Sequence, residues 1–244
     1  MEERLKNIGD WFQVKPSKRS GFSKGRSPCK LPILAIPTAR SQLRQDNIVP
    51  YLTYQGWEDK LTVEIFMLVY EGNLKMFITQ PGYKSATEAV RQHTVYRMLK
   101  QILPAIDHMH TKGIIHRDIK PENILFNNDN FYLTDFGIAK LVNDNDRPNR
   151  KGGTHHYMLP EIRKGGVQTT KVDIYGLGAT LMECLELNLP AKKDLEDWHR
   201  YIQKLIKKRA PILEDMLADD PNQRPTARSF LDSLEKSTHA LQSS

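Results

Sequence analysis

The chain has 244 residues, two cysteines, and a net charge of +7 from 36 basic and 29 acidic residues. This length suffices for one sizeable domain or two small lobes, and the widely separated Cys29 and Cys184 exclude a disulfide framework and favour a reducing compartment. No apolar run approaches the roughly 20 residues that span a bilayer, so we expect a cytoplasmic or nuclear protein without a membrane partner.

The positive charge is concentrated in residues 11–45, which contain eight lysines and arginines and no acidic residue. Without those eight, 28 basic residues remain against 29 acidic ones, so the rest of the chain is nearly neutral. Four prolines exclude a long helix in this arm: Pro16, Pro28, Pro32 and Pro37. A solvated segment is the simpler interpretation, and the alternative of a nucleic-acid site requires salt-dependent binding that is lost when the arm is deleted.

A hairpin and a long helix are expected next. Residues 48–55 and 61–70 are rich in β-branched and aromatic residues and are joined by a polar turn, which predicts two paired strands. Apolar residues recur with a helical period over about 85–111 despite Pro104, and Gly113 is well placed to end that helix.

The segment GIIHRDIKPENILF, residues 113–126, sets five polar side chains between apolar runs that predict short buried strands. We expect IIH at 114–116 to pair with ILF at 124–126, and YLT at 132–134 to lie near IAKL at 138–141. From residue 168 the pattern is helical. Residues 172–187 are apolar on nearly all sides, 194–208 are amphipathic, and 226–237 begin at a Thr226 cap.

HRDIKPEN at 116–123 and TDFGIAK at 134–140 resemble the catalytic loop and the magnesium-binding loop of eukaryotic-type protein kinases of the serine/threonine type. The resemblance runs from about residue 47 to about residue 234. It implies an α+β, protein-kinase-like two-lobed fold with a reduced β-rich N-lobe and a mainly helical C-lobe. Residues 1–46 would be a basic, poorly structured segment with an incomplete N-lobe. Residues 47–240 would be the kinase domain, with N-lobe strands to about 70 and the C-lobe from about 72.

The resemblance also implies roles for individual residues. Asp118 would accept the proton of the substrate hydroxyl or orient that hydroxyl, and Lys120 would steady the transferred phosphate. Asn123 and Asp135 would hold Mg²⁺ through oxygen ligands that bridge the phosphates of ATP. The implied reaction is phosphoryl transfer from ATP to a serine or threonine of a protein substrate. Lys120, two residues after Asp118, and Thr154, seven before Glu161, resemble the serine/threonine class.

Further positions have implied supporting roles. Met67 would guard the back of the adenine pocket, and Leu68 to Tyr70 would form the hinge that binds the purine, although a plain buried strand is an equally open interpretation. Phe136 would pack on His116, and Gly137 would allow the turn. Structural roles are implied for an ion pair between Glu161 and Arg224 and for Asp173, which would hold the backbone of the catalytic loop.

The N-terminal part departs from the family pattern. It contains no G-x-G-x-x-G, the flap that covers the ATP phosphates. Lys15, 32 residues before the NIVPY segment at 47–51, is the candidate for the phosphate-pairing lysine, or else one more charge of the basic arm. No acidic residue lies between Asp10 and Asp46 to pair with it. Two alternatives stay open: a kinase with reduced activity or an incomplete first part, and a pseudokinase that acts as a binding or scaffold module.

Phosphatase treatment is expected to leave any phosphotransfer activity unchanged. Between Phe136 and Gly153 the sequence has no serine, threonine or tyrosine, so that stretch offers no acceptor for an activating phosphate. Activity measured before and after treatment of the purified protein tests this expectation. A large loss would contradict it.

Overall fold

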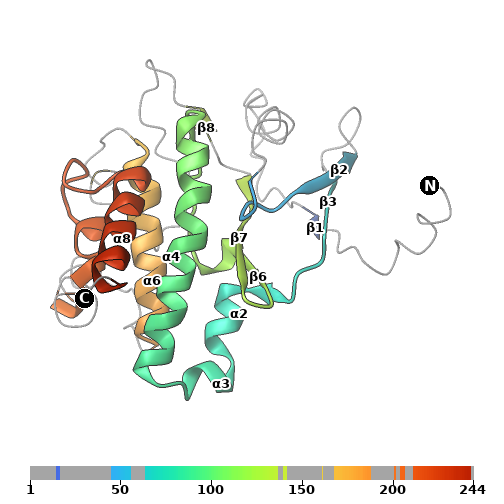
Figure 1. The fold of residues 1–244 in the computed structure, drawn as a ribbon. Helices are drawn as coiled ribbons and strands as arrows, with labels where there is room; N and C mark the ends of the chain where they lie inside the picture. The colour runs from blue at the N-terminus through green and yellow to red at the C-terminus, as the bar shows by residue number, and fades with distance from the viewer. Residues whose placement is uncertain are drawn as a thin grey trace.

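The structure is a computed structural model, drawn as a ribbon in Figure 1. It describes residues 15–16, 45–55, 64–136, 140–141, 161, 168–187, 201, 204–206 and 211–242. Helices dominate the larger part and short strands the smaller one, as expected for a two-lobed α+β fold. None of the helices in the described ranges is long and apolar enough to cross a membrane.

The smaller part is a three-stranded antiparallel sheet in the order β1-β3-β2, with β1 at Lys15–Pro16, β2 at Tyr51–Gln55 and β3 at Glu64–Met67. The predicted hairpin is therefore confirmed, with shorter strands than expected. The register shifts between Tyr51 and Thr53, which interrupts the pairing of β2 with β3 near its start.

A second sheet lies beside the long helix and has the order β4-β6-β7, with β4 at Gly72–Asn73, β6 at Ile124–Asn127 and β7 at Asn130–Leu133. The separate pair β5 and β8 joins Ile114–Ile115 to Lys140–Leu141. The predicted pairing of IIH with ILF is therefore wrong. A two-residue turn, in which Asn128 has φ 52°, joins β6 directly to β7, whereas a loop and the 3₁₀ turn η2, Pro121–Asn123, separate β5 from β6.

The helix expected over 85–111 is α4, Glu88–Thr111, which begins at the Thr87 cap, runs through Pro104 and is followed by Gly113 at φ 68°. Two short helices before it were not predicted: α2, Leu74–Thr79, and α3, Pro81–Lys84. The signal for α2 is Asn73, whose side chain accepts a hydrogen bond from the amide of Met76 at 2.9 Å.

Helix α6, Lys171–Leu185, is buried at every residue from Val172 onward, as its apolar sequence predicts. Helix α8, Ala227–Gln242, starts where predicted, because Thr226 Oγ1 accepts a hydrogen bond from the amide of Ser229 at 3.0 Å. The 3₁₀ turns η5, Pro211–Leu213, and η6, Asp215–Leu217, precede α8. Of the amphipathic stretch 194–208, the structure describes Tyr201 and Lys204–Ile206, all in helical conformation.

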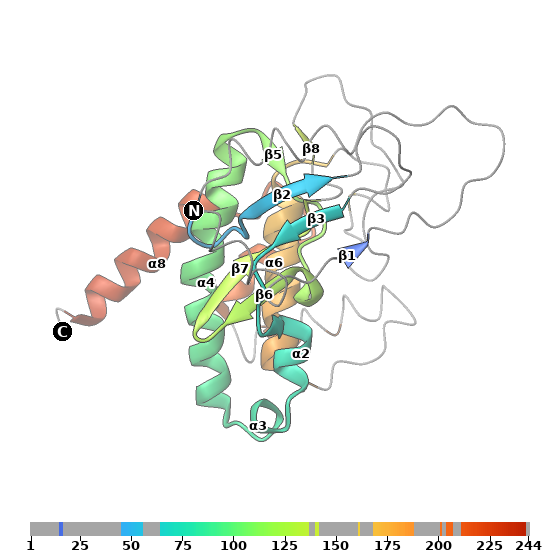
Figure 2. The same cartoon turned by 90° about the vertical axis from the view of Figure 1, so that its right-hand side faces the viewer.

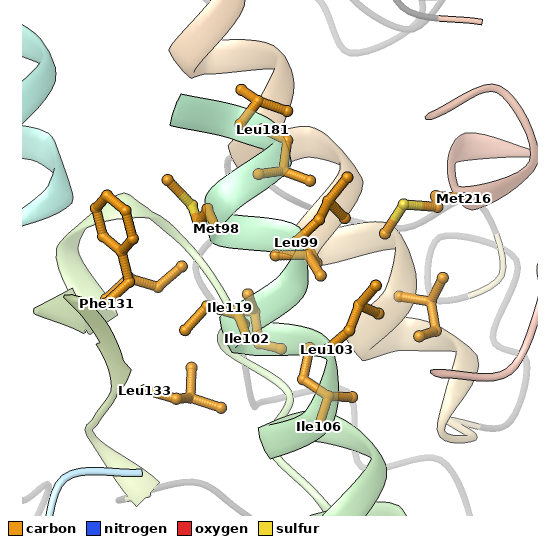
Figure 3. Packing of buried hydrophobic residues seen from close by; sticks show 14 of the residues in the cluster. Met98, Leu99, Ile102, Leu103, Ile106, Ile119, Phe131, Leu133, Leu181 and Met216 are labelled. Carbon is orange, nitrogen blue, oxygen red and sulfur yellow. The ribbon is translucent and has the colours of Figure 1, made fainter. Parts of the chain in front are cut away.

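The core is centred on α4, which packs against β7, α6 and α8. Figure 2 shows the β6–β7 hairpin against α4, with β2 and β3 above it in that view. Figure 3 shows buried side chains of β7, α6, η6 and the loop after β5 meeting those of α4. The residues labelled there are Met98, Leu99, Ile102, Leu103, Ile106, Ile119, Phe131, Leu133, Leu181 and Met216.

A buried ion pair between Glu161 and Arg224 joins two distant segments of the helical part. The Arg224 guanidinium, with a fully buried side chain, donates to Glu161 through Nη1 at 2.7 Å and through Nη2 at 2.9 Å. It also lies 4.7 Å from the centre of the Tyr175 ring. This confirms the predicted pair, whose bidentate geometry offsets the cost of removing both charges from water.

Glu161→Ala is expected to lower the free energy of unfolding by about 3–5 kcal/mol, because Arg224 would remain as a buried charge without its carboxylate. Glu235→Ala, which removes an exposed carboxylate on α8, is the matched control and should change the free energy by less than about 0.5 kcal/mol. Urea unfolding followed by circular dichroism measures both. Equal effects for the two variants would contradict a stabilising role for the buried pair.

Candidate active site

The loop between β5 and β6 brings three of the predicted site residues together. Lys120 Nζ lies 2.7 Å from Asp118 Oδ2. Asn123 donates from Nδ2 to the same oxygen at 3.0 Å and to the Asp118 carbonyl at 2.8 Å. The side chains of Asp118 and Lys120 are 15% and 17% exposed, so both reach the surface from a mostly buried position. The loop therefore presents one oriented carboxylate and one ammonium group together.

Asp173 on α6 holds this loop from the interior. Its Oδ2 accepts from the amide of His116 at 2.9 Å, and its Oδ1 accepts from the amide of Arg117 at 2.8 Å. Arg117 has φ 68°, a left-handed conformation that is uncommon for a residue other than glycine. Such a conformation persists where the surroundings fix it, and the buried carboxylate supplies that constraint. The predicted structural role of Asp173 is thus confirmed.

The same loop is tied to the segment that carries Asp135. The His116 ring is hydrogen-bonded through Nε2 to the carbonyl of Thr134 at 2.9 Å, and the amide of Thr134 donates to the carbonyl of Asn123 at 3.0 Å. The ring centres of His116 and Phe136 are 5.1 Å apart, which confirms the predicted packing. Asp135, between these anchored neighbours, is exposed and has φ 64°. Asp135 therefore directly follows a residue, Thr134, that is bonded to the loop between β5 and β6.

The donor set suits a magnesium ion that is also bound by phosphates. Both hydrogen bonds from Asn123 to Asp118 use Nδ2, so the carbonyl oxygen of that amide is turned away from Asp118. With the Asp135 carboxylate it offers hard oxygen ligands, which Mg²⁺ prefers. In the ranges that the structure describes, no group of three or more histidine, cysteine, aspartate or glutamate residues could hold a metal by itself. Asn123 and Asp135 are thus of the residue types that suit Mg²⁺, and metal binding by them stays a prediction.

Two of the predicted nucleotide-binding positions, Lys15 and Met67, lie in the smaller sheet. Lys15 in β1 pairs with Ile65 in β3, two residues before Met67, which is half-buried. After Met67 the chain is exposed, with Leu68 at 49% and Val69 at 45%. The backbone of β1 thus places Lys15 on the strand next to the one that leads to Met67, and its pairing with phosphate stays a prediction.

Tyr70, at the end of this connection, is fixed to the second sheet. Its ring packs edge-on against Tyr132 of β7 with centres 5.0 Å apart. Burial, together with the neighbouring Tyr132, raises the pKa of Tyr70 to about 12. Tyr70 therefore anchors the connection between the sheets. Thr154 and Gly137 lie outside the described residues.

Three residues of this network were missed at the sequence level. His110 is hydrogen-bonded through Nε2 to Asp173 Oδ2 at 2.9 Å, Thr134 links the two loops, and Asn47 bonds to β7. His110 could have been found from the sequence, because its spacing from Leu103 and Ile106 places it on the same buried face of α4. Thr134 bonds to His116 and Asn123 through its own backbone, and the Asn47 side chain bonds to the backbone of β7. No local pattern indicates either contact.

Comparisons with known proteins agree with this geometry. A family model described as "Protein kinase domain" matches residues 38–234. Mitogen-activated protein kinase kinase kinase 8 of Rattus norvegicus is 30% identical over 231 residues, which are 86% of this chain and 48% of that protein. Serine/threonine-protein kinase PrkC of Bacillus subtilis is 38% identical over 153 residues, which are 62% of this chain and 22% of that protein.

The name of a third relative specifies tyrosine and threonine. Membrane-associated tyrosine- and threonine-specific cdc2-inhibitory kinase wee-1.3 of Caenorhabditis elegans is 32% identical over 198 residues, which are 76% of this chain and 28% of that protein. The chain thus spans less than half the length of each of these three relatives.

Asp173→Asn is expected to loosen the loop and to lower the free energy of unfolding by about 1–3 kcal/mol, because an amide offers one acceptor oxygen where the carboxylate offers two. The amides of His116 and Arg117 should then exchange hydrogen faster, while those of α8 stay unchanged. Hydrogen-exchange mass spectrometry of a peptide covering 113–119 measures this. Asp232→Asn, an exposed substitution on α8, is the control. Unchanged exchange in the loop would contradict the assigned role.

Proposed function

Since the chain belongs to the protein kinase family, we propose that it transfers the terminal phosphoryl group of ATP, with Mg²⁺, to a serine or threonine hydroxyl of a protein. The observation that carries this proposal is the Asp118 carboxylate, partly exposed and held by Lys120 at 2.7 Å and by Asn123 at 3.0 Å. A carboxylate fixed in this way is suited to receiving a hydroxyl in one orientation.

Each residue of the loop has a definable task in this reaction. Asp118 accepts the hydrogen bond of the incoming hydroxyl and aims its oxygen at the phosphorus atom. Lys120 places a positive charge beside the same carboxylate, where negative charge from the phosphoryl group must be neutralised. Asn123 and Asp135 supply oxygen ligands for the metal. Bound ATP provides the phosphoryl group, and Mg²⁺ offsets the charge of its phosphates.

The proposal that serine and threonine are the acceptors rests on the residue types of the loop that carries Asp118 and Lys120. Lys120 follows Asp118 by two positions, the pattern that resembles serine/threonine kinases. The names of the relatives include both serine/threonine-specific and tyrosine- and threonine-specific enzymes. Hydroxyls of serine and threonine are therefore the proposed acceptors, and phosphoamino-acid analysis of a labelled substrate tests this choice.

One sequence observation favours a second candidate, a kinase-like binding module that transfers no phosphate. The segment from residue 11 to residue 45 has no acidic side chain to pair with Lys15 and no glycine-rich flap. Such a module would bind partners through its helical part. Nucleotide binding measured by thermal shift with and without Mg²⁺, followed by radiolabel transfer, separates the two candidates.

Asp118→Ala is expected to reduce transfer of labelled phosphate from ATP to a generic protein substrate by about 10²–10⁴-fold, because the group that orients the hydroxyl and accepts its proton is lost. Thermal unfolding of the variant, measured in parallel, checks that it still folds, because Asp118 is only 15% exposed and is bonded to Lys120 and Asn123. Asp232→Asn, on the exposed face of α8, is the control and should keep full activity.

Transfer that survives in Asp118→Ala would refute the assigned mechanism. Magnesium-dependent nucleotide binding by the unmodified protein without any transfer would support the binding module instead.

A further inference from the structure

The outer edge of β7 is covered by groups from two distant segments. On its inner edge β7 pairs with β6. On its outer edge Ile48 forms a parallel bridge with Leu133, the amide of Leu133 donates to the carbonyl of Asn47 at 2.8 Å, and the amide of Val49 donates to the carbonyl of Leu133 at 2.9 Å. Residues 47–49 thus extend the β4-β6-β7 sheet by a short parallel segment.

Two residues before Leu133, at Phe131, the edge is completed by side chains. The amide of Phe131 donates to Gln101 Oε1 at 2.8 Å, and the carbonyl of Phe131 accepts from Asn47 Nδ2 at 2.9 Å. All four outward backbone groups of Phe131 and Leu133 are therefore paired. An exposed strand edge normally leaves such groups to water or to another chain. Asn47 supplies two of the four partners, one from its backbone and one from its side chain.

The strand held in this way leads directly to the metal-binding segment. Leu133 is followed by Thr134, which is bonded to Asn123 and His116, and then by Asp135 at φ 64°. A residue other than glycine keeps a left-handed conformation where the surrounding structure fixes it. The pairing of Asn47 fixes the side that precedes Asp135, and the His116–Phe136 contact fixes the side that follows.

Asn47 also leads into the smaller sheet. Val49 is followed by Pro50 and β2, which pairs with β3, and β3 pairs with β1 at Lys15. Since residues 11–45 contain no acidic partner for Lys15, an ion pair from that segment cannot set the position of the smaller sheet. The contact of Asn47 with β7 connects this sheet to Asp135 by hydrogen bonds between described residues.

We propose that Asn47 is a positioning residue, whose side chain fixes the edge of β7 and thereby the presentation of Asp135 to nucleotide-bound Mg²⁺. The role toward the metal rests on the proposed function, whereas the hold on β7 does not depend on it. The side-chain amide acts as a donor to the Phe131 carbonyl, so a carboxylate of the same shape would place two acceptors against each other.

Asn47→Asp tests this with almost no change in shape, and Asn47→Ala, which introduces no charge, is the second variant if the first does not fold. Asp46→Asn, the reverse exchange at the exposed neighbouring position, is the matched control. Hydrogen exchange of the amides of residues 131–135, measured without nucleotide, should be about tenfold faster in both Asn47 variants and unchanged in the control. The amides of α6 should be unaffected in all three.

The consequence for the metal is measured by binding of the fluorescent nucleotide mant-ATP at increasing Mg²⁺. The Mg²⁺ concentration for half-maximal binding should rise by about fivefold or more in the Asn47 variants and stay the same in Asp46→Asn.

Unchanged exchange in residues 131–135 would overturn the proposal. Faster exchange with an unchanged Mg²⁺ dependence would also overturn it, because Asn47 would then only stabilise the sheet. A wild-type protein that binds no nucleotide would contradict the proposed function, and the exchange measurement alone would then decide whether Asn47 holds β7.

Discussion

The buried carboxylate of Asp173 accepts the hydrogen bonds on which the loop between β5 and β6 depends. It is fully enclosed, yet it accepts hydrogen bonds from two consecutive loop amides, at 2.9 and 2.8 Å, and from the ring of His110 at 2.9 Å. A charge removed from water at such a position is stable only when donors replace the lost water. These donors are the backbone of the loop itself. The hydrogen bonds that replace water around Asp173 therefore also hold Arg117 in its left-handed conformation and fix the position of the adjacent Asp118.

A second constraint acts on the neighbouring segment, and the two meet at His116. Its amide is held by Asp173, while its ring bonds to Thr134 and packs against Phe136. The left-handed residues Arg117 and Asp135 thus flank one buried imidazole from two different loops. Two left-handed backbone positions are thus linked through one side chain, so each loop helps to fix the backbone of the other.

Much of the site could be predicted, because it is a short continuous stretch of sequence. Asp118, Lys120 and Asn123 lie within six residues, so a turn brings them together wherever the loop lies in the fold, and their hydrogen bonds confirm this. The ion pair of Glu161 with Arg224 and the packing of Phe136 on His116 were also predicted correctly.

The pairing of β5 was predicted wrongly, because a strand of two residues has no pattern of its own and pairs with whichever strand the loops bring near. The helix α2 was missed because its six residues are too short for a period to appear.

The sequence by itself determined the chemical groups of this protein and the elements that carry them: the charged loop between apolar runs, the long helix that ends before Gly113, and the buried helix that carries Asp173. These follow from local periodicity and from the fixed chemistry of each side chain. Only the tertiary structure decided that Asn47 covers the edge of β7, that His110 joins the Asp173 carboxylate, and that β5 pairs with β8. Each of these contacts joins residues far apart in sequence through hydrogen bonds, and a hydrogen bond between distant groups leaves no periodic mark in the chain.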